Sequence, residues 1–352
     1  MSTDDVVLTA QAAADEAGIA PDPRSAPPVR WGILGAGGIS GSFAEAVRRF
    51  TNGTVTAVGS RQRTKAESFA SAHEIARAHG SYEDLVEDPD VDVVYVGTPH
   101  SHHHEHALLA LSAGKPLLVE KAFTRNHTEA LEVFDAARSA DLFVMEAMWT
   151  RFLPHVLALR EALAAGEIGE VKTFLGSYGA RFPFDPSHRA YAPELAGGAL
   201  LDIGVYPISF AHDLFGAPGN VSANGTLTET GVDGQAVVAL DFADGVHAAI
   251  STTLWAWTPE NITVGGTDGY VTTDRWTYGG GGFTVHAPDG EVRRRYEGFR
   301  GEGKQYQAAE VARCLDAGVT QSERMSWQDT LDVLRTLDEI RRQVGVVYPG
   351  EE

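Results

Sequence analysis

Two residues in the second half of this sequence could move a proton to or from a hydroxyl group. Asp202 and Tyr206 lie four residues apart in a segment that predicts a helix, so one helix face would present both side chains. A carboxylate beside a phenol could take the proton of a hydroxyl while a hydride leaves the same carbon. An ordinary amphipathic helix with a half-buried tyrosine remains the alternative for this pattern.

A glycine-rich stretch near the beginning of the chain predicts a dinucleotide site. Residues 29–34 form an apolar segment typical of a strand, and a helix is expected from about Phe43. Gly35 would allow a sharp turn, and Gly37 would let the backbone approach a pyrophosphate at the helix N-terminus. Ser40 stands where the third glycine of the fingerprint is usual, and it is small enough for close packing. A tight turn without a ligand is the alternative.

The segment after the second predicted strand, 54–58, indicates which dinucleotide would bind. Ser60 and Arg61 follow this strand, and no acidic residue is present there to bind the ribose hydroxyls of NAD. Because a guanidinium matches the geometry of a phosphate, we expect NADP to bind in preference to NAD. A solvated basic start to a helix would give the same pattern.

Lys121 is a further candidate for chemistry. Glu120-Lys121 follows the apolar segment 116–119, a predicted strand, so the lysine would lie at the carboxyl end of the sheet. There it could bind the nicotinamide ribose and donate a hydrogen bond to a substrate oxygen. A Glu–Lys pair exposed on the surface is the competing interpretation.

Histidines are concentrated just after the strand predicted at residues 91–96. His102 and His106 have the spacing of two metal ligands on a helix, but neither a cysteine nor a clear acidic partner completes a site. We therefore expect no metal, and interpret the stretch as a loop that lines the cofactor or as an exposed helix start. The five histidines are His100, His102, His103, His104 and His106.

Composition excludes several classes of protein. The formal net charge of −20 disfavours nucleic acid or an anionic membrane as the main partner, since both would be repelled. The single cysteine, Cys314, permits no intrachain disulfide, which fits a reducing compartment. No apolar run has transmembrane length, and the N-terminus lacks the order of a signal peptide. We expect a cytoplasmic protein.

The elements that would position these residues form two domains after a flexible arm at residues 1–27, which could contain a short helix at 10–17. Residues 28–150 alternate strands and helices, which predicts an α/β Rossmann domain with a doubly wound parallel sheet. Residues 151–352 predict an α+β domain with a largely antiparallel open sheet. The expected elements include helices at 65–79, 104–113, 128–139, 153–165, 199–215, 305–317 and 327–344, and strands at 142–145, 171–178, 237–242 and 246–254.

Taken together, these motifs resemble one family of oxidoreductases. Gly35–Ser40, Thr98-Pro99 with His103, Glu120-Lys121 and Asp202–Tyr206 occur in the order and spacing of the glucose-fructose oxidoreductase / inositol dehydrogenase / rhizopine catabolism (Gfo/Idh/MocA) family. The resemblance covers about residues 29–348. Within the family, residues 145–154 and 197–202 are most similar to the branch of dihydrodiol and D-xylose dehydrogenases.

The resemblance implies a nicotinamide-dependent dehydrogenase that acts on sugars, polyols or cyclic diols. Lys121 matches the family's catalytic lysine, Tyr206 its proton donor or acceptor, and Asp202 the acid that orients substrate. The family usually has proline after the lysine, often in a cis peptide, whereas this chain has Ala122; His100 replaces a frequent asparagine. Residues expected to bind the cofactor are Gly35, Gly37, Gly38, Ile39, Ser60, Arg61, Thr98, Pro99, His100, His103, Glu120 and Lys121.

Three functions are compatible with this resemblance. The first is an NADP-dependent dehydrogenase or reductase acting on CH–OH groups. The others are a regulator that binds the dinucleotide without catalysis, and a glycosidase that uses tightly held NAD.

Substrate charge and assembly can also be predicted. Because the helix at 199–215 has no Lys or Arg, we expect a neutral sugar, polyol or cyclic diol, with Arg181 and Arg189 as the nearby cations that could instead hold an anion. Trp255 and Trp257 alternate on a predicted strand, and an apolar patch there would favour a homodimer through the C-terminal sheet.

Overall fold

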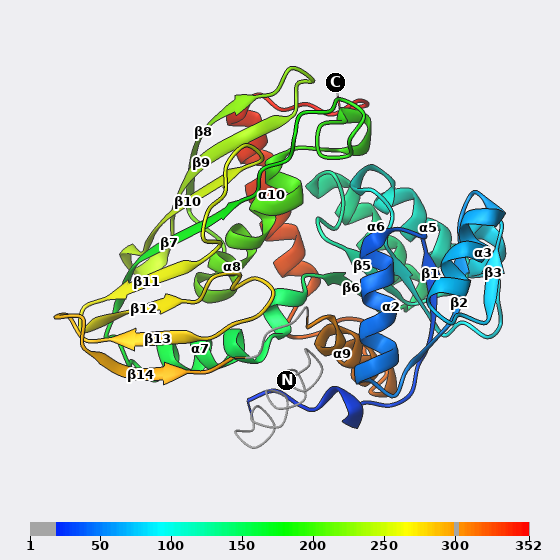
Figure 1. Ribbon diagram of the computed structural model, residues 1–352, viewed down its shortest axis with the longest axis horizontal. Coiled ribbons are helices and arrows are strands. Elements are labelled where there is room, and N and C mark those ends of the chain that lie inside the picture. Colours follow the sequence, from blue (N-terminus) through cyan, green and yellow to red (C-terminus); the bar gives the residue numbers. More distant parts are fainter. Residues whose placement is uncertain (1–18, 299–302, 352) are drawn as a thin grey trace. The chain divides into compact units, whose positions relative to one another are not determined.

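Six parallel strands form the first of two sheets, in the order β3-β2-β1-β4-β5-β6 (Figure 1). This is the strand order of the Rossmann fold, in which the direction of winding reverses between β1 and β4. Strands β4, β5 and β6 are buried along their whole length, as expected for strands covered by helices on both faces. The strands are β1 (Arg30–Leu34), β2 (Thr54–Gly59), β3 (Arg77–His79), β4 (Val93–Val96), β5 (Leu117–Glu120) and β6 (Val144–Ala147).

The computed structural model describes residues 19–298 and 303–351, which divide into two units. The parallel-sheet unit contains residues 22–149 and 303–331, and the mixed-sheet unit contains residues 19–21, 150–298 and 332–351. In the parallel-sheet unit, α2 packs against α9, and α5 packs against α6. Its helices are α2 (Gly38–Phe50), α3 (Arg63–Ala72), α4 (Tyr82–Val86), α5 (His103–Ser112), α6 (His127–Ala140) and α9 (Lys304–Asp316). Helix α10 (Trp327–Val344) begins in this unit and ends in the other.

Three local features of the parallel-sheet unit differ from the sequence-based expectations. The helix expected at 65–79 ends at Ala72, because Glu74 takes a left-handed conformation (φ 58°) and Arg77–His79 then pairs with β2 as an edge strand. Helix α9, which the division at residue 150 assigns to the second domain, packs within this unit. The last part of the expected arm is attached here, since Arg313 donates to the Asp22 carbonyl at 2.9 Å. The helix expected at residues 10–17 lies outside the described residues.

The second sheet has eight strands in the order β14-β13-β12-β11-β7-β10-β9-β8. Only the pairing of β7 with β10 is parallel, so the sheet is mixed and mostly antiparallel, as the sequence predicted. The strands are β7 (Val171–Gly179), β8 (Asn220–Leu227), β9 (Asp233–Asp241), β10 (His247–Thr253), β11 (Ile262–Gly266), β12 (Gly269–Thr273), β13 (Phe283–His286) and β14 (Val292–Tyr296).

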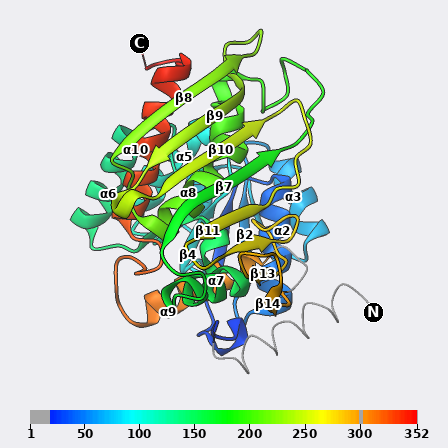
Figure 2. The ribbon, with the colours of Figure 1, turned by 90° about the vertical axis from the view of Figure 1, so that its left-hand side faces the viewer.

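Helices cover one face of this mixed sheet. Helix α8 (Val205–Phe215) packs on β7 and β10, and it continues a five-residue π-helical turn, η5 (Leu200–Gly204). Helix α7 (Pro154–Ala164) belongs to the same unit. The opposite face of the sheet is turned toward the viewer in Figure 2, where no helix of the unit is drawn over it. Along β9 and β10, buried and exposed residues alternate accordingly.

The strand expected to contain Trp255 and Trp257 was predicted too long. Strand β10 ends at Thr253, and both tryptophans lie in the loop that follows, with 38% and 66% of their surface exposed. The Trp255 ring lies against Gly234 rather than beside Trp257 on a sheet face. The alternation of the two tryptophans therefore carries no information on the sheet interface.

Candidate active site

The glycine turn of the parallel-sheet unit joins β1 to α2 and has the form a dinucleotide requires. Gly35 has a φ of 108°, and a Cβ at this position would press against Thr98 and the Gly97 carbonyl. Gly37 is the N-cap of the 13-residue helix α2, and no side chain caps the helix there. Among residues 19–298 and 303–351, no atom lies within 4 Å of the place that a Cβ on Gly38 would occupy. The helix N-terminus is therefore open to an anion.

Ser40 occupies the third position of the fingerprint, and the structure shows how it is accommodated. The Ser40 side chain is fully buried, and a Cβ on Gly97 would overlap its Oγ atom. The glycine that close packing requires is thus on the neighbouring segment after β4, instead of in the helix. Serine can replace the usual glycine at position 40 because Gly97, which has no side chain, leaves room for the Ser40 hydroxyl.

The basic residues after β2 are Arg61, Arg63 and Lys65, and the two arginines have identifiable partners. The Arg61 guanidinium and the Tyr82 hydroxyl are hydrogen-bonded, and this contact opposes the rise that burial causes in the Tyr82 pKa. Arg63 forms a surface ion pair with Glu67 at 2.8 Å. Ser60 is buried, and its Oγ accepts a hydrogen bond from the Gln62 amide at 3.3 Å. Arg61 is thus directed toward Tyr82, a residue that the sequence analysis did not single out.

His103 connects the loops that follow β4 and β5. Its Nε2 atom lies 2.8 Å from the Thr98 carbonyl oxygen, and its Nδ1 atom lies 2.9 Å from the Ala122 carbonyl oxygen. The ring is 1% exposed, and burial lowers the pKa of His103. Thr98 is held further by His106, whose Nδ1 is 3.0 Å from the Thr98 Oγ1. These contacts join two of the loops at the carboxyl edge of the sheet.

Glu120 and Lys121 are both buried, which excludes the exposed surface pair as an interpretation. The Tyr95 hydroxyl donates to Glu120 Oε1 at 2.6 Å, and the Lys121 amide donates to Glu120 Oε2 at 3.3 Å. Burial raises the pKa of Glu120, while the charges of Lys121 and Lys304 oppose that rise. The peptide bond between Lys121 and Ala122 is cis. Glu120 thus supports the backbone that carries the lysine.

Lys304 is a buried cation that sequence analysis missed. Its side chain is 3% exposed, its Nζ donates to Ser42 Oγ at 3.2 Å, and it lies 4.5 Å from the centre of the Trp149 ring. It is almost two hundred residues from Glu120 in the chain, so no local pattern could have associated the two.

The mixed-sheet unit carries Asp202 and Tyr206 at the junction of η5 and α8. Both side chains are buried, with 5% and 8% of their surface exposed. Arg189 Nη1 forms an ion pair with Asp202 Oδ1 at 3.0 Å, and the charge of Asp202 raises the Arg189 pKa, with a smaller contribution from Tyr206. The two residues therefore interact with the same cation, although a π-helical turn replaces the regular helix assumed from their spacing.

Aromatic rings surround Tyr206 within the same unit. Its ring centre lies 5.5 Å from that of Tyr178 and 5.8 Å from that of Tyr278. Tyr178 and Tyr278 are stacked, with ring centres 5.3 Å apart. The resulting surroundings are apolar but contain hydroxyl groups, and they can contact the face of a sugar or a cyclic diol.

The histidine stretch has partners other than a metal. His102 pairs with Glu105 at 2.9 Å, and His104 pairs with Glu132 at 2.8 Å. Burial lowers the pKa of His106 to about 4. Over residues 19–298 and 303–351, no group of three or more His, Cys, Asp or Glu side chains could hold a metal ion.

In the same part of the chain, no helix has the length and apolar character needed to cross a membrane.

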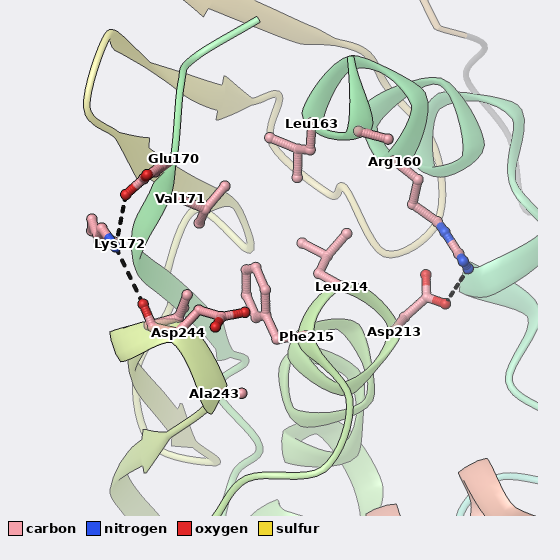
Figure 3. A pocket seen from close by; sticks show the side chains of 12 residues that line it. Arg160, Leu163, Glu170, Val171, Lys172, Asp213, Leu214, Phe215, Ala243 and Asp244 are labelled. Carbon is pink, nitrogen blue, oxygen red and sulfur yellow. Dashed lines mark hydrogen bonds and ion pairs between the residues drawn. The ribbon is translucent and has the colours of Figure 1, made fainter. Parts of the chain in front are cut away.

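A surface hollow of about 810 Å³ lies apart from these residues in the mixed-sheet unit (Figure 3). Four of its charged side chains form two pairs: Arg160 contacts Asp213 at 2.5 Å, and Lys172 contacts Glu170 at 3.2 Å. None of the residues that line it was predicted to be functional.

Comparison with known proteins gives two family matches. Residues 29–148 match the model described as "Oxidoreductase family, NAD-binding Rossmann fold", and residues 156–272 match the GFO/IDH/MocA C-terminal domain. Together they span most of both predicted domains.

Similar proteins include two curated dehydrogenases and two solved structures. The chain is 39% identical to a trans-1,2-dihydrobenzene-1,2-diol dehydrogenase of Danio rerio over 91% of this chain and 98% of that protein. The Bos taurus enzyme of the same name is 35% identical, with 92% and 99% covered. The 3-ketoreductase KijD10 of Actinomadura kijaniata, solved with NADP and TDP-benzene, has a TM-score of 0.81 at 26% identity, with 90% and 98% covered. A levoglucosan dehydrogenase shares the fold, with a TM-score of 0.78 at 22% identity and 91% and 98% covered.

Proposed function

The chain belongs to the Gfo/Idh/MocA family of NAD(P)-dependent oxidoreductases, and from this we propose that it oxidises a neutral cyclic diol or sugar with NADP. The observation that carries the proposal is the ion pair of Arg189 with Asp202 beside Tyr206. Asp202 compensates the charge of Arg189, so Arg189 is less suited to hold a phosphate or a carboxylate. Carboxylate, phenol and aromatic groups suit a substrate with hydroxyls and an apolar face.

In the proposed reaction, Tyr206 acts as the phenolate, accepts the proton of the substrate hydroxyl and becomes a neutral phenol. The positive charge of Lys121 would favour the phenolate, and Asp202 would orient the substrate. The cofactor supplies hydride acceptance: the carbinol hydrogen leaves with both electrons of its C–H bond, and the carbon becomes a carbonyl. Removing the O–H proton in the same step avoids building positive charge on that oxygen. Support comes from the burial of each side chain within its own unit: 9% of Lys121, 5% of Asp202 and 8% of Tyr206 is exposed.

Preference for NADP is supported by the surroundings of Arg61. No acidic residue lies between Ser60 and Ala66, and the hydrogen bond with Tyr82 orients the guanidinium. The open N-terminus of α2 would receive the pyrophosphate of the same cofactor.

A panel of substrates tests the activity. We expect turnover of added NADP with trans-1,2-dihydrobenzene-1,2-diol or with neutral sugars, and much lower kcat/KM with sugar phosphates and sugar acids. A clear preference for an anionic substrate, abolished in Arg189→Ala, would contradict the proposal. The absence of net NADP turnover with any member of the panel would favour a regulator or an NAD-dependent glycosidase.

We also propose that the open face of the mixed sheet joins two copies of this chain. A row of paired residues crosses seven strands of that face without a charge, and each of them is at least partly exposed. Its members are Ser222, Ala239, Ala249, Leu175, Thr263, Thr272 and Thr284. The neighbouring row carries Val237, which is 62% exposed. Charged residues flank this row, namely the Asp241–His247 pair and Arg295 of β14. An uncharged row of this length on a chain with a net charge of −20 favours an interface.

Sedimentation at micromolar concentration tests this assembly. We expect a dimer for the natural chain and a monomer for Val237→Arg, which places a charge beside the uncharged row. Val319→Arg is the matched control, because Val319 is an exposed valine (45%) of the parallel-sheet unit. A natural chain that sediments only as a monomer would contradict the proposed interface.

A further inference from the structure

A pair of glycines comes directly before the helical segment that carries Asp202 and Tyr206. Gly198 has a φ of 116°, and its amide donates to the Ala190 carbonyl at 2.9 Å. A Cβ on Gly197 would lie 2.7 Å from the carbonyl oxygen of Arg189, the residue that pairs with Asp202. The turn thus packs against the backbone of that cation, so a movement of the turn would affect both members of the ion pair.

Asp233 holds this turn from the side of the sheet. It is the first residue of β9, its side chain is completely buried, and its Oδ2 accepts a hydrogen bond from the Leu200 amide at 2.7 Å. A Cβ on Gly198 would overlap its Oδ1 atom, so glycine is needed there both for the backbone conformation and for the approach of the carboxyl group. The contact joins residues 33 positions apart.

Tyr348 holds the same turn from the end of the chain. Its hydroxyl donates to the Gly197 carbonyl at 2.6 Å, across a separation of 151 residues, and the side chain is 1% exposed. Its ring lies 4.8 Å from the Arg341 guanidinium, which pairs with Glu351 at 2.8 Å and with Asp338 at 2.9 Å. Glu351 also accepts a hydrogen bond from the Tyr348 amide at 3.0 Å. The last described residues are therefore fastened around one tyrosine.

We propose that Asp233 and Tyr348 are positioning residues for the reaction, because they hold the turn from which Asp202 and Tyr206 are aimed. The inference rests on the proposed roles of Asp202 and Tyr206. A displacement of a reacting group by about 1 Å can lower a rate by about 100-fold, so a loosened turn should lower kcat even though neither residue touches substrate. Cofactor binding belongs to the parallel-sheet unit and should be unaffected.

Tyr348→Phe tests the proposal with a minimal change, since the ring on Arg341 remains and only the hydroxyl is lost. We expect kcat to fall about tenfold with the best neutral substrate of the panel, while the KM for NADP stays within twofold of the natural value. Amide hydrogen exchange over residues 199–206 should become faster. Asp233→Ala should lower kcat at least as far, whereas Asp233→Asn, which keeps an oxygen able to accept from the Leu200 amide, should restore most of it.

Gln343→Ala is the matched control. Gln343 lies near Arg341 in α10 and ties that helix to β8, through Val221 at 2.8 Å and Ala223 at 2.7 Å, without reaching the glycine turn. It should lower stability while leaving kcat and exchange at 199–206 unchanged. If Tyr206→Phe reduces kcat but Tyr348→Phe and Asp233→Ala do not, the positioning proposal is wrong. If Tyr206→Phe itself leaves kcat unchanged, the proposed function is at fault instead. Because Asp233→Ala could fail to fold, Tyr348→Phe carries the test independently.

Discussion

Lys121 in the parallel-sheet unit is supported by adjacent strands, whereas Asp202 and Tyr206 in the mixed-sheet unit depend on the far end of the chain. The loop of Lys121 is tied to the segment after β4 and to strand β6: His103 lies beside the Ala122 carbonyl, and the Phe123 amide donates to Glu146 at 3.1 Å. In the mixed-sheet unit, the turn before η5 is tied to Tyr348, 151 residues away.

The difference follows from topology. In a doubly wound parallel sheet, consecutive strands lie side by side and their carboxyl-end loops converge, so nearby segments can support one another. In the mixed-sheet unit, β7 lies between β11 and β10, and helix α10, which follows every strand in the chain, is tied to β8 through Gln343. Its site residues are therefore sensitive to changes at positions remote in sequence.

Removing Lys121 should give the largest effect on the parallel-sheet side of this comparison. We expect Lys121→Ala to lower kcat by about 100-fold or more, as for a positioned acid–base group, while the protein remains folded. Steady-state kinetics and thermal unfolding measure the two quantities. Lys115→Ala is the control: the Lys115 Nζ donates to the carbonyls of Asp88 and Val91, so this change should affect stability without affecting kcat. Near-normal turnover in Lys121→Ala would place the chemistry elsewhere.

The packing of Ser40 against Gly97 gives a test of local support in the same unit. Gly97→Ala should lower the free energy of unfolding by about 2 kcal/mol, because the added methyl overlaps Ser40 Oγ and presses on Tyr95. Urea denaturation of Gly97→Ala, Ser40→Gly and the double variant measures the coupling. We expect Ser40→Gly to recover part of the loss. Strictly additive effects would show that the two positions do not constrain one another.

Asp233 provides a pH test on the mixed-sheet side. Burial raises the pKa of Asp233 to about 7, and the Leu200 amide and the Arg341 charge oppose this rise. An unfolded aspartate titrates near 4, so the folded state binds the extra proton between about pH 4 and 7. This contribution to stability is fully present below about pH 4 and is lost as the pH rises through about 7.

Between pH 5 and 8, we therefore expect the free energy of unfolding of the natural chain to fall by about 2 kcal/mol relative to that of Asp233→Asn. Arg341 stays charged throughout, and burial raises the pKa of Tyr348 well above its usual value, so neither neighbour titrates in this interval. Denaturant unfolding of both proteins at each pH isolates the contribution of Asp233 to the free energy of unfolding. Parallel pH profiles for the two proteins would contradict the assignment.

The smallest expected effect concerns cofactor choice, which the parallel-sheet unit should control alone. Arg61→Ala should weaken NADP binding about tenfold, or about 1.4 kcal/mol, and leave NAD binding nearly unchanged. Arg63→Ala is the matched control, because Arg63 is paired with Glu67 on the surface. Fluorescence titration with each dinucleotide measures both affinities. Equal losses for NADP and NAD in Arg61→Ala would refute a role in phosphate recognition.

Those parts of the protein whose geometry is local could be predicted from the amino-acid sequence. The strand, glycine turn and helix at residues 30–50 were predictable because Gly35 is needed for a left-handed backbone and α2 follows at once. Buried parallel strands such as β4 and β5 are short apolar runs, which is why they could be located to within two or three residues. The position of Lys121 after β5 then followed from the rule on carboxyl-end loops.

Strand ends and side-chain pairings that involve residues remote in sequence became evident only in the folded structure. The alternation of Trp255 and Trp257 suggested a strand, but β10 ends at Thr253, where its pairing with β9 and β7 stops. Arg189 was recognised only as a cation near the substrate helix, and its pairing with Asp202 became evident in the fold. Asp233 and Tyr348 had no motif around them at all. A buried polar group must find a partner, but packing chooses which one, and residues 33 or 151 positions apart leave no periodic signal in the sequence.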